Sequence, residues 1–236
     1  ILLPMLLCVC LTLCSCGSNE STEKPSAASS DTAAKDSFSA TTAAAGSRDN
    51  TPVVLTGSAD GTVTYGNDSV TVDASHTEEG YLMVSYSGSN SKVKLQITGS
   101  DEITYTYNLH DGYETFPLTS GSGSYTVGVF ENIEGTSYST LFTQAIDVTI
   151  QDEFGPYLYA NQYVNFSADS KVISKAMELS ASANDDLEVI ENVYNYIITN
   201  FTYDYDKAAA VQSGYLPDVD DVLASQTGLC FDYAAV

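Results

Sequence analysis

The last nine residues of the chain, Gly228 to Val236, place a cysteine where a nucleophile could work. Cys230 follows a Gly-x step and opens an apolar, Ala-rich stretch that predicts the first turn of a helix. A thiol at a helix N-terminus faces free backbone N–H groups and the positive end of the helix dipole, and both stabilise the thiolate. The thiolate is the form that attacks carbonyl carbon, so the chemistry we expect is acyl transfer.

Two predicted helices come before this cysteine and must help to position it. Residues 168–170 can cap a helix that runs to about Ser182. Asp185, with Glu188 three residues later, forms a capping-box pattern that opens a second helix. Apolar residues recur at helical spacing in this second helix and predict a stripe that faces the core: Leu187, Ile190, Tyr194, Ile197 and Phe201.

An acidic cluster, Asp218, Asp220 and Asp221, lies between the second helix and the cysteine. Its spacing matches no EF-hand calcium loop, so we interpret it as turn and helix-cap chemistry. We expect no metal and no cofactor in this protein.

The order of these elements resembles a known superfamily. A helix leads into Phe201-Thr-Tyr-Asp-Tyr205, a variable loop follows, and the chain ends on Val222-Leu223 and Gly228-Leu-Cys-Phe-Asp-Tyr-Ala234. Over roughly residues 165–236 this is similar to the N-terminal part of the transglutaminase-like core of bacterial exported proteins. The resemblance implies that Cys230 is the nucleophile of a Cys-His-Asp triad whose His and Asp lie on later strands. It also implies a thioester intermediate, with the oxyanion bound by the Cys230 backbone N–H and one other donor.

Five other residues have types or positions that bear on this chemistry. Gln226 could donate to an oxyanion, but its spacing favours a hydrogen bond within the loop. The two histidines, His76 and His110, precede the cysteine and are predicted to be surface or turn residues. Asp232 is expected to cap the helix or pair with another group, because a charge beside the thiolate opposes its formation. Gly228 is expected to permit the tight turn into the helix.

Residues 52–150 predict an all-β domain that resembles an immunoglobulin-like sandwich in architecture. Short β-rich or alternating runs are separated by Gly, Asn and Asp turn signals, as in such sandwiches. No Trp and no cysteine pair pins the predicted sheets together. The predicted strands are 69–73, 81–86, 92–98, 102–108, 113–118, 124–130 and 141–150.

The chain begins with an apolar run that has the length of a secretion signal. Leu13-Cys14-Ser15-Cys16 resembles a bacterial lipobox, which implies cleavage before Cys16 and lipid on its sulfur. The alternative is an ordinary secretory signal that contains cysteines. Four of the five cysteines lie in this signal region, so Cys230 is left without a disulfide partner. Residues 17–51 are rich in Ser, Thr and Ala and predict a disordered linker.

The net charge of −23, from 31 acidic and 8 basic residues, excludes nucleic-acid binding, which needs clustered Lys and Arg. We expect a multidomain protein with four parts: a lipoprotein signal (1–16), a linker (17–51), the sandwich (52–150) and the first part of an α+β transglutaminase-like, or cysteine proteinase, fold (151–236).

We expect a cysteine-dependent acyl transferase, peptidase or amidase acting on peptide or protein amides. It would be lipid-anchored through Cys16 on the outer face of the bacterial membrane. The alternative is a lipid-anchored surface binding or adhesion protein that uses the transglutaminase-like fold only as a scaffold. Both histidines precede Cys230, so we expect residues 1–236 alone to lack the triad's His and Asp and to be inert.

Overall fold

The computed structural model describes residues 46–236. The predicted signal, Cys16 and most of the predicted linker lie outside the described residues. Within residues 46–236, no helix combines the length and apolar character needed to cross a membrane.

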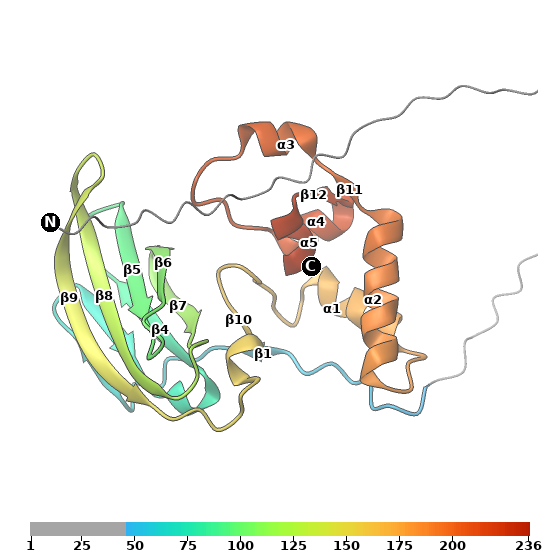
Figure 1. Ribbon diagram of the computed structural model, residues 1–236, viewed down its shortest axis with the longest axis horizontal. Coiled ribbons are helices and arrows are strands. Elements are labelled where there is room, and N and C mark those ends of the chain that lie inside the picture. The colour runs from blue at the N-terminus through green and yellow to red at the C-terminus, as the bar shows by residue number, and fades with distance from the viewer. Residues whose placement is uncertain (1–45) are drawn as a thin grey trace, which may run out of the picture. The chain divides into compact units, whose positions relative to one another are not determined.

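Two four-stranded antiparallel sheets, made by residues 64–148, form the part that we call the β-sandwich (Figure 1). Each sheet contains strands from both halves of this segment, so neighbours in space are often distant in sequence. The first sheet has the order β2 (Thr64–Gly66), β3 (Val70–Asp73), β4 (Tyr81–Tyr86), β7 (Gly112–Pro117). The second has the order β6 (Thr104–Leu109), β5 (Val93–Thr98), β8 (Gly123–Glu134), β9 (Ser137–Val148).

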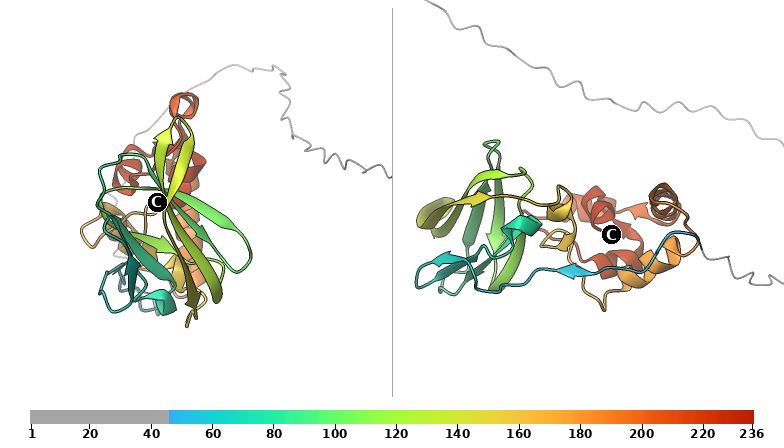
Figure 2. Two further views of the ribbon diagram at one scale, coloured as in Figure 1. Left: turned by 90° about the vertical axis from the view of Figure 1, so that its left-hand side faces the viewer. Right: turned by 90° about the horizontal axis from the view of Figure 1, so that it is seen from below.

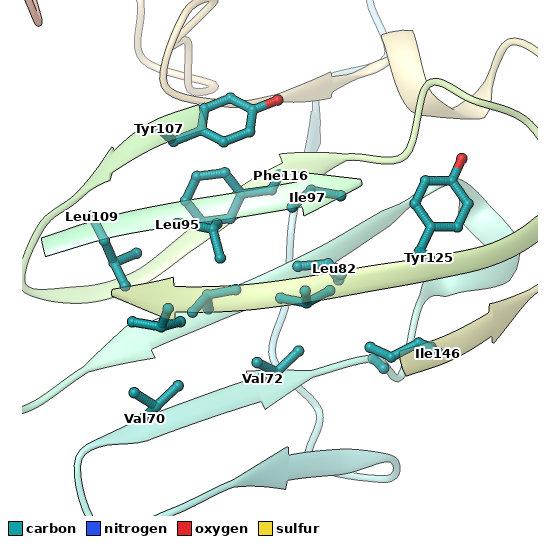
Figure 3. Close-up of a cluster of buried hydrophobic side chains, with 14 of the residues drawn as sticks. Val70, Val72, Leu82, Leu95, Ile97, Tyr107, Leu109, Phe116, Tyr125 and Ile146 are labelled. Carbon is teal, nitrogen blue, oxygen red and sulfur yellow. The ribbon is translucent and has the colours of Figure 1, made fainter. Parts of the chain in front are cut away.

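The core of the β-sandwich lies between these two sheets, and the layers can be followed in Figure 2. Along β5, alternate side chains are buried, as a half-buried strand requires. The apolar side chains of both sheets meet in one cluster, which Figure 3 shows at close range. Its largest fully buried members are Tyr125, Phe116, Leu82, Leu95, Ile97 and Leu118. The alternation read in the sequence therefore corresponds to an observed core.

The hairpin of β8 and β9 is longer than the sequence predicted. The predicted strands are 124–130 and 141–150, whereas β8 runs to Glu134 and β9 starts at Ser137. Pairing continues through polar residues at the tip, with register shifts at Val129/Phe130 and Asn132/Glu134. Backbone hydrogen bonds can extend a hairpin beyond the point where side chains are buried, so side-chain alternation underestimates its length.

A short parallel pair lies outside the two sheets and involves both sequence neighbours of the β-sandwich. β1 (Leu55–Thr56) pairs with β10 (Tyr159–Ala160), next to the 3-10 helix η2 (Gly155–Tyr157). Part of the segment expected as linker also makes contacts with the later chain. Arg48 Nε lies 2.7 Å from Asp186 Oδ1, and Ser47 N donates to Asn184 Oδ1 at 3.1 Å. A second 3-10 helix, η1 (Thr77–Glu79), precedes β4.

Residues 169–236 are mainly helical, and we call them the helical region. The mixture of antiparallel sheets and helices agrees in outline with the predicted β-rich part followed by an α+β part. Its elements are α1 (Lys171–Ser180), α2 (Asp186–Asn200), β11 (Thr202–Tyr203), α3 (Tyr205–Ala210), α4 (Val219–Ser225), β12 (Thr227–Gly228) and α5 (Cys230–Ala235).

The start of α2 follows the predicted capping pattern with one displacement. Asp185 Oδ1 accepts the backbone N–H of Glu188 at 2.9 Å, as an N-cap should. The Glu188 carboxylate reaches back to the N–H of Asn184 at 2.7 Å, one residue earlier than a capping box requires.

The predicted core-facing stripe of α2 is wrong for three of its five residues. Leu187, Ile190 and Tyr194 are 75%, 63% and 61% exposed, while Phe201 is buried. Ile197, the fourth residue of the predicted stripe, is half-buried and faces α1 and α4 together with Val193 and Tyr196, which the stripe does not include. Because α2 carries apolar residues on two of its faces, their spacing does not show which face is buried, and the predicted stripe includes residues from the exposed face.

Candidate active site

The Tyr-rich segment after α2 lies directly beside the approach to Cys230. β11 and β12 pair in parallel, with Tyr203 opposite Gly228. The pairing is held by the N–H of Thr202, which donates to Gln226 O at 2.9 Å, and that of Asp204, which donates to Gly228 O at 3.0 Å. Two motifs that are separated in sequence therefore form one structural unit that holds the entry to α5.

Cys230 is the first residue of α5, and its thiol is free and exposed. Leu229 lies between β12 and α5 in an extended conformation and is the N-cap residue of α5. The predicted helix start at the cysteine is therefore observed, and no disulfide occupies the thiol within the described residues. An exposed thiol at a helix start can meet a substrate carbonyl without rearrangement of the backbone.

Gly228 is required for a different reason from the one expected. Gly228 does not have a positive φ, so the turn does not require the left-handed conformation that favours glycine. A Cβ at this position would lie 2.7 Å from the Cβ of Asp232 and 2.8 Å from its Oδ2. The absence of a side chain thus lets the Asp232 carboxylate approach the backbone closely.

Asp232 is fully buried, and it both caps α5 and pairs with a cation, as the sequence led us to expect. Its Oδ2 accepts the N–H of Leu229 at 2.7 Å and lies 2.9 Å from Lys207 Nζ. Its Oδ1 accepts the hydroxyl of Tyr215 at 2.5 Å. Leu229 has no polar side chain, so Asp232 supplies the only side-chain oxygen available to cap this helix from within it.

The charge state of this group follows from those contacts. Burial raises the pKa of Asp232, but the hydrogen bonds from Leu229 and Tyr215 and the charge of Lys207 outweigh it and lower the pKa below its usual value. Burial lowers the pKa of Lys207, but the contacts with Tyr215 and Asp232 outweigh it and raise the pKa. Both groups are therefore charged at neutral pH.

The sequence pattern identifies neither Lys207 nor Tyr215, which lie in the segment after Tyr205 that we expected to be a variable loop. Lys207 lies on α3, and Tyr215 lies in the loop that follows. A signal for α3 was present, since Asp204 precedes a Lys-Ala-Ala-Ala run and its side chain accepts the N–H of Lys207 at 2.8 Å. The pairing with Asp232 spans 25 residues and had no local signal.

Gln226 ends α4 in a left-handed conformation, with φ at 51°. Its side-chain Nε2 donates to the hydroxyl of Tyr196 on α2 at 3.2 Å. The sequence favoured a hydrogen bond within the loop, whereas the observed partner lies 30 residues away on α2. No contact in the structure tests whether the amide could serve an oxyanion, so that role stays a prediction.

Both histidines lie in the β-sandwich. His76 precedes η1, where its Nδ1 lies 3.2 Å from Glu79 and its Nε2 lies 3.0 Å from Asp60. His110 lies in a turn with its side chain about half exposed, and its Nδ1 lies 3.0 Å from Glu114. They are turn residues, as predicted, although His76 is more enclosed than a surface residue.

The acidic cluster acts as helix caps, as predicted. Asp218 Oδ1 accepts the N–H groups of Asp220 and Asp221 at the start of α4, at 3.1 and 3.0 Å. Asp220 Oδ1 accepts the N–H of Val172 at 3.1 Å, so it also satisfies the start of α1. Across residues 46–236, no group of three or more His, Cys, Asp or Glu side chains has the arrangement of a metal site.

Aromatic contacts surround the residues that flank Cys230. The ring of Phe231 lies edge-on to Tyr163, at 5.5 Å between centroids, and 6.4 Å from Tyr215. The ring of Tyr233 lies at 5.7 Å from Phe201, where α2 ends. The Tyr233 hydroxyl is buried and has no hydrogen-bond partner among the described residues. These contacts fix α5 on two sides.

Comparison with known proteins agrees with the resemblance seen in the sequence. Residues 169–236 match the model of a family described as a transglutaminase-like domain. The match covers less than a third of the chain and coincides with the helical region. No curated protein and no solved structure matches the chain. The match supports the transglutaminase-like superfamily for this region, and such domains are typical of cysteine-dependent acyltransferases and proteases.

Proposed function

We propose that this protein is a cysteine-dependent acyl transferase, peptidase or amidase of transglutaminase-like type, with Cys230 as its nucleophile. The observation that carries the proposal is the exposed free thiol at the first residue of α5, inside the segment that matches the family model. The paired β11 and β12 strands and the buried cap at Asp232 hold this thiol at a defined place.

The proposed reaction is acyl transfer through a thioester. The Cys230 thiolate attacks the carbonyl carbon of a peptide or side-chain amide, and the carbon–nitrogen bond breaks as the nitrogen takes up a proton. An amine or water then attacks the thioester, and the thiolate is released. The resemblance assigns the proton transfers to a His oriented by an Asp. The oxyanion would be met by the Cys230 backbone N–H, with Gln226 as a candidate for the second donor.

The test is amide turnover by the product of the complete gene, compared with its Cys230→Ala variant. Ammonia release from a Gln-containing peptide reports attack on the side-chain amide, incorporation of an added amine separates transamidation from hydrolysis, and a new amino terminus reports peptidase activity. We expect Cys230→Ala to lose all turnover above background, with a fall of at least about a thousandfold. A thioester adduct on the Cys230 peptide, seen by mass spectrometry, would identify the intermediate. Full activity in Cys230→Ala would overturn the proposal.

The second candidate is a lipid-anchored surface binding or adhesion protein that uses the transglutaminase-like fold only as a scaffold. A complete gene product that binds a cell-surface partner but turns over no amide would support this alternative.

We also propose that the β-sandwich is immunoglobulin-like and that lipid on Cys16 anchors the protein to the outer face of a bacterial membrane. The sheet orders β2-β3-β4-β7 and β6-β5-β8-β9 support the first part, since non-consecutive strands pair as in a Greek key. The lipobox pattern supports the second. Incorporation of labelled palmitate that disappears in Cys16→Ala would support lipidation, and incorporation unchanged by that substitution would contradict it.

A further inference from the structure

The buried Asp232 lies two residues after the exposed Cys230 in the same short helix. To cap α5, Asp232 needs only one carboxylate oxygen, because the capping contact is to a single N–H group, that of Leu229. Its other contacts, with Lys207 Nζ at 2.9 Å and the Tyr215 hydroxyl at 2.5 Å, exceed what capping requires. The extra contacts therefore need another explanation.

Stability alone explains the ion pair poorly. Asp232 is fully buried and loses its hydration, whereas the Lys207 side chain keeps 28% of its exposure, and burying a charge in such a pair often gives no net stability. Lys207 is also held by more than its carboxylate partner. Its Nζ lies 4.4 Å from the centroid of the Tyr215 ring and donates to the hydroxyl of the same residue. This arrangement fixes a positive charge at one place beside α5.

The position of the charge matters because of the thiol. An uncompensated carboxylate two residues from Cys230 would oppose formation of the thiolate. The positive charge of Lys207 compensates the negative charge of Asp232, and the Tyr215 hydroxyl further stabilises the carboxylate by donating a hydrogen bond to Oδ1. Lys207 from α3 and Tyr215 from the following loop both lower the pKa of Asp232, and the neighbouring ring of Tyr233 on α5 is the other titratable group coupled to it. The capping contact is thus retained without its electrostatic penalty.

We infer that Lys207 and Tyr215 are positioning residues for Cys230, which hold Asp232 as a charge-compensated cap so that the first turn of α5 can present a thiolate. The inference rests on the proposed function, because a thiolate is needed only if Cys230 is the nucleophile. It goes further by assigning a role to two residues outside the cysteine motif.

The test measures the pH dependence of Cys230 alkylation by iodoacetamide, with the Cys230 peptide quantified by mass spectrometry so that the other cysteines do not interfere. The variants are Lys207→Gln, Asp232→Asn and the double variant. Lys207→Gln leaves the carboxylate uncompensated, so we expect the midpoint of the alkylation profile to rise by about one pH unit. Asp232→Asn should lower it.

The double variant separates charge compensation from a structural role. With neither charge present, its midpoint should return to within about 0.3 pH unit of the wild type. A structural role predicts instead that the two substitutions add their damage. A midpoint unmoved by Lys207→Gln, or a double variant no closer to the wild type than Lys207→Gln, would overturn the inference.

Gentler substitutions keep the test decisive if Lys207→Gln unfolds the helical region. Lys207→Arg keeps the charge and should keep the wild-type midpoint. Tyr215→Phe removes one hydroxyl and should raise the midpoint by a few tenths of a pH unit. Tyr233→Phe, which removes a hydroxyl without a partner, is the matched control and should leave the profile unchanged. Equal profiles for the Tyr215→Phe and Tyr233→Phe variants would count against the inference.

The alkylation test does not depend on turnover. If the complete gene product turns over no amide but the midpoints move as expected, the proposed function fails, and only the electrostatic coupling of Lys207 and Asp232 to Cys230 stands. If turnover depends on Cys230 but the midpoints do not move, the positioning role fails alone.

Discussion

In the β-sandwich the apolar side chains of two sheets meet in one continuous core, with Leu82, Leu95 and Phe116 completely inaccessible. In the helical region, by contrast, several large apolar side chains stay on the surface, among them Leu187 and Ile190. The most enclosed polar group of the helical region, Asp232, lies beside the candidate nucleophile. The β-sandwich thus uses burial mainly to build a core, whereas the helical region uses it to hold a charged network near Cys230.

The largest expected difference between the two regions concerns leucine truncation. Leu82→Ala should lower the free energy of unfolding by about 3 kcal/mol, because it removes buried methyl groups and leaves a cavity. Leu187→Ala, on the exposed row of α2, should change it by less than about 0.5 kcal/mol. Urea unfolding followed by circular dichroism measures both. Similar losses for the two variants would break the comparison.

Two glycine substitutions, one in each region, compare how tightly the backbone is packed in the helical region and in the β-sandwich. Gly228→Ala should destabilise the helical region by about 2 kcal/mol, because the new Cβ would overlap Asp232. Gly121→Ala, in the β-sandwich, has open space around the new Cβ but a φ of 72°, so it should cost about 1 kcal/mol. Thermal melts read separately at helical and strand wavelengths assign each loss to its region. A Gly228→Ala protein as stable as wild type would show that Asp232 can move aside.

Two buried tyrosine hydroxyls test how polar groups are satisfied in each region. Tyr125 donates to Gly121 O at 2.8 Å in the β-sandwich, so Tyr125→Phe should cost about 1 kcal/mol. Tyr233→Phe removes a hydroxyl that has no partner, so it should be neutral or stabilise slightly. Urea unfolding is again the measurement. A larger loss for Tyr233→Phe than for Tyr125→Phe would indicate an unrecognised partner of that hydroxyl.

The smallest expected effect is the pH dependence of the β-sandwich at His76. Burial lowers the pKa of His76, but Glu79 and Asp60 outweigh it and raise the pKa above its usual value. The protonated ring therefore stabilises the fold below the pKa of the unfolded chain, and this stability is lost as the pH rises through the raised value. We expect a contribution of about 0.5 to 1 kcal/mol, seen as a slope in stability above about pH 6.5.

His76→Asn is the control for that slope. The variant lacks the titrating ring, so the difference in unfolding free energy between wild type and His76→Asn should shrink as the pH rises. A difference that is constant between about pH 5 and 9 would show that the two carboxylates do not favour the charged ring.

Much of the β-sandwich could be predicted because period-two alternation leaves little choice of face. A strand such as Val93–Thr98 has only two sides, so its apolar residues identify the core side directly. The short strand β2 was missed because three residues, Thr64–Gly66, carry no alternation. Its place comes from pairing with β3, a contact that backbone hydrogen bonds make without any side-chain pattern.

In the helical region the sequence located the caps and the nucleophile but not their partners. Asp185, Asp218 and Cys230 were placed correctly because a helix start is signalled by residues within one turn. The buried row of α2 was misassigned because the helix is apolar on two faces. The partners of Asp232 were missed because they come from 25 and 17 residues away.

The sequence by itself therefore determined the β-rich first part, the helix caps and a cysteine at a helix start within a transglutaminase-like segment. Those features depend on side-chain periodicity and on interactions over three or four residues, which a linear pattern records. Only the tertiary structure decided which face of α2 is exposed, why Gly228 must lack a side chain and what balances the charge of Asp232. These depend on which segments meet in space, and no local pattern encodes the approach of Lys207 and Tyr215 to the start of α5.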